Sequence, residues 1–365
     1  MIRVLLVDDS PVALAVLSRM IQQIDGVTVA GTALGGAEAL ELIPKLQPHV
    51  VCTDLHMPNI NGLMLVRAIM ARHPLPILVI SISVQHHGDD IHIFQLLDAG
   101  AVDVFPKPKG GLQDINQSLV HQLAEKIRVL ASVIPGQKRL RKAPQQPVLQ
   151  PEYSWQQPAT AQPAMLSAAA MLQTVHDLRA RPRLVAIGAS TGGPQALKTL
   201  FARLPGDWSL PILCVQHISH GFLSEFMQWL SRDTALSIRV ATPGHRPRGG
   251  CIYFAPERSH LTVDNEGCFV IPQQREQTEY HPSIDQLFHS VARCHGQYGA
   301  GILLTGMGSD GAEGLLAMAQ RGALTVAQDQ DSCVVFDLPR QAIERQACRY
   351  VLSLNAISDL LKSMV

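Results

Sequence analysis

The sequence predicts an α/β protein with a mostly parallel sheet in each half of the chain. Short apolar runs alternate with amphipathic helical patterns up to about residue 132, and the alternation resumes at residue 183. A stretch rich in proline and glutamine separates the two halves and is typical of a linker. We therefore predict a first domain at 1–132, a linker at 133–182 and a second domain at 183–365.

In the first half, each apolar run is followed by a helical pattern. Five such units in succession predict a five-stranded parallel sheet with helices on both faces. The expected strands are 3–7, 27–31, 49–53, 76–81 and 101–105, and the expected helices are 11–24, 36–46, 61–72, 88–99 and 112–133.

The second half repeats this arrangement with an interruption. Residues 237–272 contain turn signals such as the Asp-Asn-Glu-Gly run at 264–267, so we expect short antiparallel strands there. The remainder predicts a mostly parallel α/β domain with a β-rich insertion. Its expected strands are 183–188, 210–216, 300–304 and 322–327, and its expected helices are 193–204, 221–231, 309–320 and 355–363.

Composition excludes several classes of protein. The formal net charge is zero, which gives no electrostatic footprint for nucleic acid. The seven cysteines are scattered, odd in number and form no C-x-x-C pair, which favours a reducing compartment over a disulfide framework. There is no signal-peptide pattern and no apolar run near the roughly 18 residues that span a bilayer. We therefore expect a cytoplasmic protein without membrane insertion.

Acidic, hydroxyl or basic side chains follow four of the five strands expected in the first half. Asp8 and Asp9 come after the first strand, Asp54 after the third, Ser81 after the fourth and Lys107 after the fifth. Functional groups gather at the carboxyl ends of strands in a parallel sheet, and clustered carboxylates favour a cation such as Mg²⁺. Asp54 is the candidate to accept a phosphoryl group, with Lys107 neutralising charge and Ser81 hydrogen-bonding the phosphate. The alternative is that each acid caps a helix.

The second half carries a candidate nucleophile. Residues 188–192 fit G-x-S-x-G directly after a strand, which places Ser190 at a tight strand-to-helix turn. His217 and Asp310 each follow another expected strand and are the candidate base and orienting acid. A glycine-rich turn of this kind can instead cradle a phosphate. Ser283 and Asp285 precede a further helix, and together with His281 they are better explained as structural than as catalytic residues.

The first constellation resembles the receiver domain of two-component response regulators over residues 1 to about 130. Lys107-Pro108 matches the Lys-Pro step of that family. The resemblance implies a flavodoxin-like fold, phosphorylation at Asp54, and a magnesium site made by Asp8, Asp9, Asp54 and the carbonyl of His56.

The second half resembles the chemotaxis protein-glutamate methylesterase/glutamine deamidase family, CheB. The resemblance rests on G-A-S-T-G-G at 188–193, Q-H at 216–217, Y-F-A-P at 253–256, H-P-S-I-D at 281–285 and T-G-M-G-S-D-G at 305–311. It implies Ser190 as nucleophile, His217 as general base, Asp310 as orienting acid, and Thr191 and Met307 beside the oxyanion. No cofactor is implied for the esterase chemistry.

The combined resemblance implies a hydrolase for chemotaxis adaptation that phosphorylation activates. The expected substrates are γ-glutamyl methyl esters on methyl-accepting chemoreceptors, and receptor glutamines are expected to be deamidated. The expected phosphodonor is the histidine kinase CheA. Two alternatives remain: a non-catalytic scaffold that competes for phosphate, and a DNA-binding regulator, which the lack of a helix-turn-helix signal or basic face disfavours.

Overall fold

The computed structural model describes residues 1–81, 93–108, 116–132, 181–272 and 282–365. It contains two compact units, one within Met1–Arg139 together with Ile218–Trp229 and one within Leu140–His217 together with Leu230–Val365. Nearly all of the predicted linker lies outside the described residues. Among the described residues, no helix combines the length and apolar character that crossing a bilayer requires.

The first unit is built on a five-stranded parallel sheet with the strand order β2-β1-β3-β4-β5. Strands β1, β3, β4 and β5 are fully or mostly buried, as expected for a sheet covered on both faces, whereas the edge strand β2 is mostly half-buried. The elements are β1 (Ile2–Val7), α1 (Pro11–Gln22), β2 (Val27–Ala33), α2 (Gly36–Leu46), β3 (Val50–Thr53), α3 (Gly62–Arg72), β4 (Ile77–Ser81), α4 (Phe94–Ala99), β5 (Asp103–Pro106) and α5 (Gln117–Ser132).

Two helix layers enclose this sheet. Helix α1 packs beside α5 on one face, and α3 lies between α2 and α4 on the other. Buried residues of α1 and α5 meet β1, β3 and β4 in one apolar core. The predicted five strand–helix units are confirmed, although residues 88–92 of the fourth expected helix and residues 112–115 and 133 of the fifth lie outside the described part of the chain.

The second unit is built on a seven-stranded sheet with the order β14-β13-β12-β6-β7-β9-β8. All of its strand pairs are parallel. A separate two-stranded antiparallel ribbon joins β10 to β11. The strands are β6 (Leu184–Ala189), β7 (Ile212–Gln216), β8 (Ser237–Val240), β9 (Cys251–Phe254), β10 (Thr262–Val263), β11 (Phe269–Val270), β12 (Gly299–Leu303), β13 (Leu324–Gln328) and β14 (Tyr350–Leu352).

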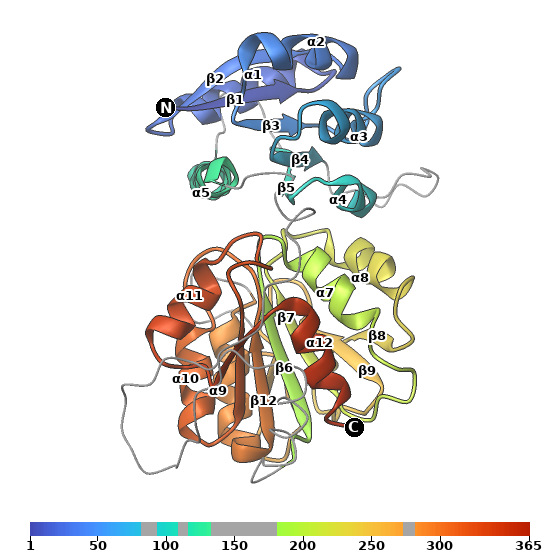
Figure 1. Cartoon of the computed structure of the whole chain (residues 1–365), viewed down its shortest axis with the longest axis vertical. Coiled ribbons are helices and arrows are strands. Elements are labelled where there is room, and N and C mark those ends of the chain that lie inside the picture. Colours follow the sequence, from blue (N-terminus) through green and yellow to red (C-terminus); the bar gives the residue numbers. More distant parts are fainter. Residues whose placement is uncertain (82–92, 109–115, 133–180, 273–281) are drawn as a thin grey trace, which may run out of the picture. The chain divides into compact units, whose positions relative to one another are not determined.

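Helices cover both faces of this larger sheet. Figure 1 shows α7 and α12 on one face and α9, α10 and α11 on the other, in agreement with the contacts between these helices. The helices are α7 (Gly193–Phe201), α9 (Ile284–His295), α10 (Ala312–Gln320), α11 (Asp337–Glu344) and α12 (Leu354–Lys362), with a 3₁₀ turn at Gly296–Tyr298. Helix α8 (Leu223–Ser231) is divided between the two units after Trp229.

The sequence-based prediction for 237–272 was partly wrong. Strands β8 and β9 pair in parallel and extend the main sheet, whereas only β10 and β11 form the expected antiparallel pair. The local sequence of a four-residue strand bounded by turns does not show whether the strand runs parallel or antiparallel to its neighbour in the sheet. That direction depends on which strand becomes the neighbour. Strand β14 and helix α11 were not predicted, and both are short.

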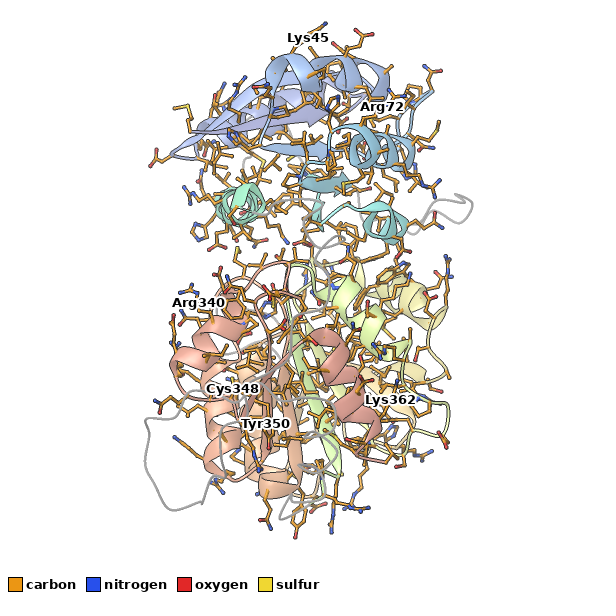
Figure 2. All side chains as sticks on the ribbon, viewed as in Figure 1. Lys45, Arg72, Arg340, Cys348, Tyr350 and Lys362 are labelled. Carbon is orange, nitrogen blue, oxygen red and sulfur yellow. The ribbon has the colours of Figure 1, made fainter. Side chains whose placement is uncertain are left out.

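Local signals fix several helix ends. Ser10, Ser283 and Ser353 are N-cap residues whose side chains accept a backbone N–H of the first turn. At the opposite ends, the last turns of α2, α3 and α12 carry Lys45, Arg72 and Lys362, which are labelled in Figure 2. Positive charge there complements the negative end of the helix macrodipole.

Candidate functional sites

The first candidate site lies where the order of the five-stranded sheet reverses. Strands β1 and β3 are neighbours although β2 comes between them in sequence, and Val7 pairs with Thr53 in the register. Asp8 and Asp54 therefore leave the sheet side by side, at the topological switch point where α/β sheets bind ligands. Lys107 comes from the end of β5, and its N–H donates to the Ser81 carbonyl at 2.8 Å.

Lys107 joins the two buried carboxylates. Its Nζ lies 2.6 Å from Asp8 Oδ2 and 2.7 Å from Asp54 Oδ2. Burial raises the pKa of the Asp8 carboxyl, although hydrogen bonds from Lys107 and the Ser10 N–H oppose the shift. Burial alone would lower the pKa of Lys107, but hydrogen bonds to Asp54 and Asp8 outweigh it and raise that pKa. The half-buried lysine therefore holds the two negative charges together.

The donor set suits a hard divalent cation. Oxygen atoms of Asp8, Asp9 and Asp54 lie within 4.8 Å of one another, and Asp9 is exposed while the other two are buried. Carboxylates with one side open to water are the ligands that Mg²⁺ prefers, so the acidic triad is a typical magnesium site. Ser81 is buried at the end of β4, and His56 is exposed in the loop that follows Asp54.

The second candidate site lies at the switch point of the seven-stranded sheet. Strand β6 is flanked by β7 on one side and β12 on the other, so the chain order reverses there. Ser190 follows β6 directly, His217 follows β7, and Asp310 lies in the loop after β12. The three residues selected from sequence thus come from the carboxyl ends of three adjacent strands.

The turn that carries Ser190 is held by its backbone. The Ser190 N–H donates to the Thr305 carbonyl at 3.0 Å, and the Gly193 N–H donates to the Ser190 carbonyl at 2.8 Å. Gly192 has φ +76° at the N-cap of α7, a left-handed conformation that glycine adopts without strain. A Cβ there would lie 2.5 Å from the Cβ of Val334. The sequence therefore permits a tight turn packed against the 334 loop.

Gln216, which sequence reasoning missed as a functional residue, bridges Ser190 and His217. Its Nε2 donates to the Ser190 carbonyl at 2.9 Å and to the His217 carbonyl at 2.8 Å. The His217 N–H donates to the Ala189 carbonyl at 2.9 Å. Gln216 is 4% exposed. The signal available in the sequence was an amide residue at the end of an apolar strand, where a buried amide needs hydrogen-bond partners.

Thr305 is a second buried residue with several hydrogen bonds, here called a hub, that sequence reasoning did not select. Its hydroxyl lies 3.0 Å from the carbonyls of Thr191 and Val335 and accepts the N–H groups of Val334 and Val335. The expected oxyanion-side residues flank this hub: Thr191 is buried, and Met307 is half-buried in the loop after β12. Thr305 therefore connects the Ser190 turn with two neighbouring loops.

Asp310 is anchored on the N-terminus of α9. Its Oδ2 lies 2.8 Å from His217 Nε2 and accepts the Ile284 N–H at 2.6 Å. Its Oδ1 accepts the Ser283 hydroxyl at 2.9 Å and the Asp285 N–H at 3.0 Å. Burial would raise the pKa of this carboxyl, but the hydrogen bonds and the charge of His217 lower it overall. The carboxylate is therefore held ionised and in one orientation.

Asp285 and Asp310 stand in a reciprocal arrangement. The Asp285 carboxylate, in the first turn of α9, accepts the N–H of Gly314 in α10. The Asp310 carboxylate, just before α10, accepts the N–H of Asp285 in α9. Burial raises the pKa of Asp285, with Asp310 adding to the shift. The predicted capping role of Ser283 is confirmed, because its Oγ accepts the Gln286 N–H at 3.3 Å. His281 lies outside the described residues.

Both halves of the chain match families of known proteins. Residues 185–361 match the CheB methylesterase family model, and residues 4–119 match the response regulator receiver domain model. A relative from Nitrosospira multiformis is 35% identical over 100% of this chain and 97% of its own length. One from Hahella chejuensis is 36% identical over 99% of this chain and 98% of its own.

Both relatives are named protein-glutamate methylesterase/protein-glutamine glutaminase, the second with the number 3. Among solved structures, the catalytic domain of Thermotoga maritima CheB methylesterase is 30% identical with a TM-score of 0.48. That comparison covers 50% of this chain and 99% of the other.

Proposed function

The chain belongs to the CheB family of receiver-linked protein-glutamate methylesterases/protein-glutamine glutaminases, and on this premise we propose that Ser190, His217 and Asp310 are its catalytic triad. It is an enzyme of chemotaxis adaptation whose family acts on chemoreceptors. The observation that carries the assignment is the 2.8 Å contact between His217 Nε2 and an Asp310 carboxylate that the α9 N-terminus holds in place. We assign 1–132 to the receiver, 183–365 to the esterase and 133–182 to the linker.

The proposed chemistry is acyl transfer in two steps. Ser190 Oγ attacks the carbonyl carbon of a γ-glutamyl methyl ester, while His217 takes the hydroxyl proton. Since Nε2 faces Asp310, the accepting atom is Nδ1. The tetrahedral intermediate then loses methoxide, which receives the proton from His217 and leaves as methanol. The product of this step is a glutamyl ester of Ser190.

In the second step, His217 removes a proton from water as the water attacks the acyl-enzyme. The Ser190 ester bond breaks, the proton returns to Ser190 Oγ, and the receptor glutamate is released. A receptor glutamine follows the same course with ammonia as the leaving group. Thr191 and Met307 lie on the oxyanion side, where the N-terminus of α7 favours negative charge.

The receiver is the proposed control element. A receiver domain implies a phosphodonor kinase, and we assign this role to the histidine kinase CheA. Asp54 accepts the phosphoryl group, Lys107 neutralises its charge and Ser81 hydrogen-bonds it. Asp8, Asp9, Asp54 and the His56 carbonyl would hold Mg²⁺, which supplies charge neutralisation during phosphoryl transfer.

Methanol release from membranes that carry methylated chemoreceptors tests the esterase assignment. The full chain should release methanol, and Ser190→Ala should abolish release because it removes the nucleophile. Asp310→Asn should lower kcat by orders of magnitude, since His217 loses its orienting carboxylate. A Ser190→Ala variant as active as the natural chain would contradict the triad. An inactive natural chain would instead favour the phosphate-competing scaffold.

A further inference from the structure

The Ser283 side chain makes two hydrogen bonds, one that caps a helix and one to the acid of the proposed triad. It is the N-cap of α9, and its Oγ accepts the Gln286 N–H at 3.3 Å. The same oxygen lies 2.9 Å from Asp310 Oδ1. Ser283 and Asp310 are each 5% exposed, so water does not substitute freely for this contact. A residue expected only to cap a helix thus touches the acid of the triad.

The direction of the second hydrogen bond is fixed by chemistry. A serine hydroxyl has one proton, and the Gln286 N–H can only donate to it. The ionised carboxylate of Asp310 can only accept, so the hydroxyl proton points to Oδ1. A donor to a carboxylate makes a strong, charge-assisted hydrogen bond, which restricts rotation of the carboxyl group.

The backbone of Ser283 is itself anchored. Its N–H donates to His260 Nδ1 at 3.1 Å, and His260 is 5% exposed. Within the described part of the chain, the titratable groups that interact with Asp310 include His217 from the end of β7 and Asp285 from α9. Ser283 therefore joins a fixed buried framework to the Asp310 carboxylate, which contacts His217.

We propose that Ser283 is a positioning residue for the esterase reaction, whose hydroxyl orients the Asp310 carboxylate toward His217. The proposal rests on the proposed triad and adds to it a residue that acts through Asp310. With the hydroxyl present, Oδ1 is held by Ser283 and the Asp285 N–H, which leaves Oδ2 directed at His217. Without it, Asp310 keeps the N–H donors of Ile284 and Asp285, but Oδ1 loses its hydroxyl donor and the carboxyl group is held less firmly.

The chain offers a matched control. Ser353 is the N-cap of α12, and its Oγ accepts the Ala356 N–H at 3.3 Å, the same length as the Ser283 cap bond. Methanol release by the full chain is measured for Ser283→Ala, Ser283→Thr and Ser353→Ala on methylated receptor membranes. Both alanine variants lose a cap, but only Ser283→Ala loses a donor to Asp310.

We expect Ser283→Ala to lower kcat about tenfold with KM unchanged, because a hydrogen bond to a charged group that shapes the transition state is lost. The acid limb of the pH profile should move to higher pH, since fewer donors leave more carboxylate charge to stabilise protonated His217. Ser283→Thr keeps a hydroxyl and should recover most of the rate. Ser353→Ala should keep the natural kinetics.

Equal kinetics for Ser283→Ala and Ser353→Ala would overturn the proposal and leave Ser283 as a cap alone. Should Ser283→Ala fail to fold, Ser283→Gly replaces it, because glycine is tolerated at N-caps and lacks the hydroxyl. Failure of the triad itself looks different: Asp310→Asn would then be as active as the natural chain. That result would overturn both assignments.

Discussion

Half-buried Asp285 and buried Asp310 lie close together, yet their environments shift their pKa values in opposite directions. Burial acts to raise both, but Asp310 also has His217 and more donors, so its pKa falls while that of Asp285 rises. Such divergence separates a carboxylate that stays charged from one whose charge is costly. At the scale of single residues, the hydrogen-bond donors and charges around each carboxylate therefore determine whether its pKa rises or falls.

This divergence gives a pH-dependent prediction for Asp285→Asn. A carboxyl whose pKa is higher in the folded state destabilises the fold once it ionises, so its cost is absent below the unfolded pKa of about 4. The cost grows as pH rises through the folded pKa. Asparagine avoids it and keeps an oxygen for the Gly314 N–H. Urea unfolding should show the variant gaining stability relative to the natural chain from pH 4 upward; a loss at pH 7 would contradict this.

A second prediction concerns Gln216→Met, which keeps the length of the side chain and removes both N–H donors. The carbonyls of Ser190 and His217 then lose their common partner, so nucleophile and base are no longer held together. We expect kcat to fall about ten- to a hundredfold with KM unchanged, because small misplacements of reacting groups are costly. Steady-state methanol release measures both constants. A natural kcat in a folded variant would show that the bridge has no catalytic role.

The three residues that we propose for catalysis were easier to predict from sequence than the residues that position them. Ser190, His217 and Asp310 each follow an apolar strand, and a nucleophile, a base and an acid at strand ends form a recognisable set. Gln216 and Thr305 act through hydrogen bonds to backbone carbonyls of loops distant in sequence. No local pattern specifies such partners, because they depend on which strands become neighbours.

At the scale of elements, periodicity predicted long units and failed on short ones. The alternation that predicted β1 to α5 extends over five repeats, so each unit supports the next. Strand β14 has three residues and α11 has eight, which is too short for a clear period. The parallel direction of β8 follows from its pairing with β9, a tertiary choice that turns at 237–272 did not reveal.

The turn before α7 supports a prediction at this scale. Gly192→Ala places a Cβ 2.5 Å from the Cβ of Val334 at φ +76°, so either the Ser190 turn or the 334 loop must move. Gly244→Ala is the matched control, with φ +77° and nothing within 4 Å of the added Cβ. Both should lose about 1–2 kcal/mol of unfolding free energy from the left-handed conformation.

Only Gly192→Ala should also lose catalytic rate, because it displaces the nucleophile. Denaturant unfolding and methanol release, measured on both variants, separate the two effects. If Gly244→Ala lost as much rate as Gly192→Ala, the loss would come from backbone strain in general and the close packing of Val334 against the turn would be irrelevant.

At the scale of the whole molecule, two sites of different chemistry occupy the switch points of two sheets. One cluster of carboxylates with Lys107 suits phosphoryl transfer, and the Ser190 constellation suits acyl transfer. Each was predicted from side chains at strand ends, without any knowledge of the other. The coupling between them was predicted from the presence of both sites in one chain. The structure adds nothing to that prediction, because residues 133–180 lie outside its described part.

That coupling is open to direct measurement in the full chain. Addition of a small-molecule phosphodonor with magnesium should raise methanol release, because Asp54 gains charge beside Lys107 and the receiver shifts toward its active state. A coupling free energy of about 1–3 kcal/mol corresponds to about a 5- to 150-fold change. Asp54→Asn should keep the basal rate and lose the response, since its amide cannot be phosphorylated. A response that persists in Asp54→Asn would mean that the phosphodonor acts elsewhere, and an unresponsive natural chain would mean that phosphorylation of the receiver does not control the esterase.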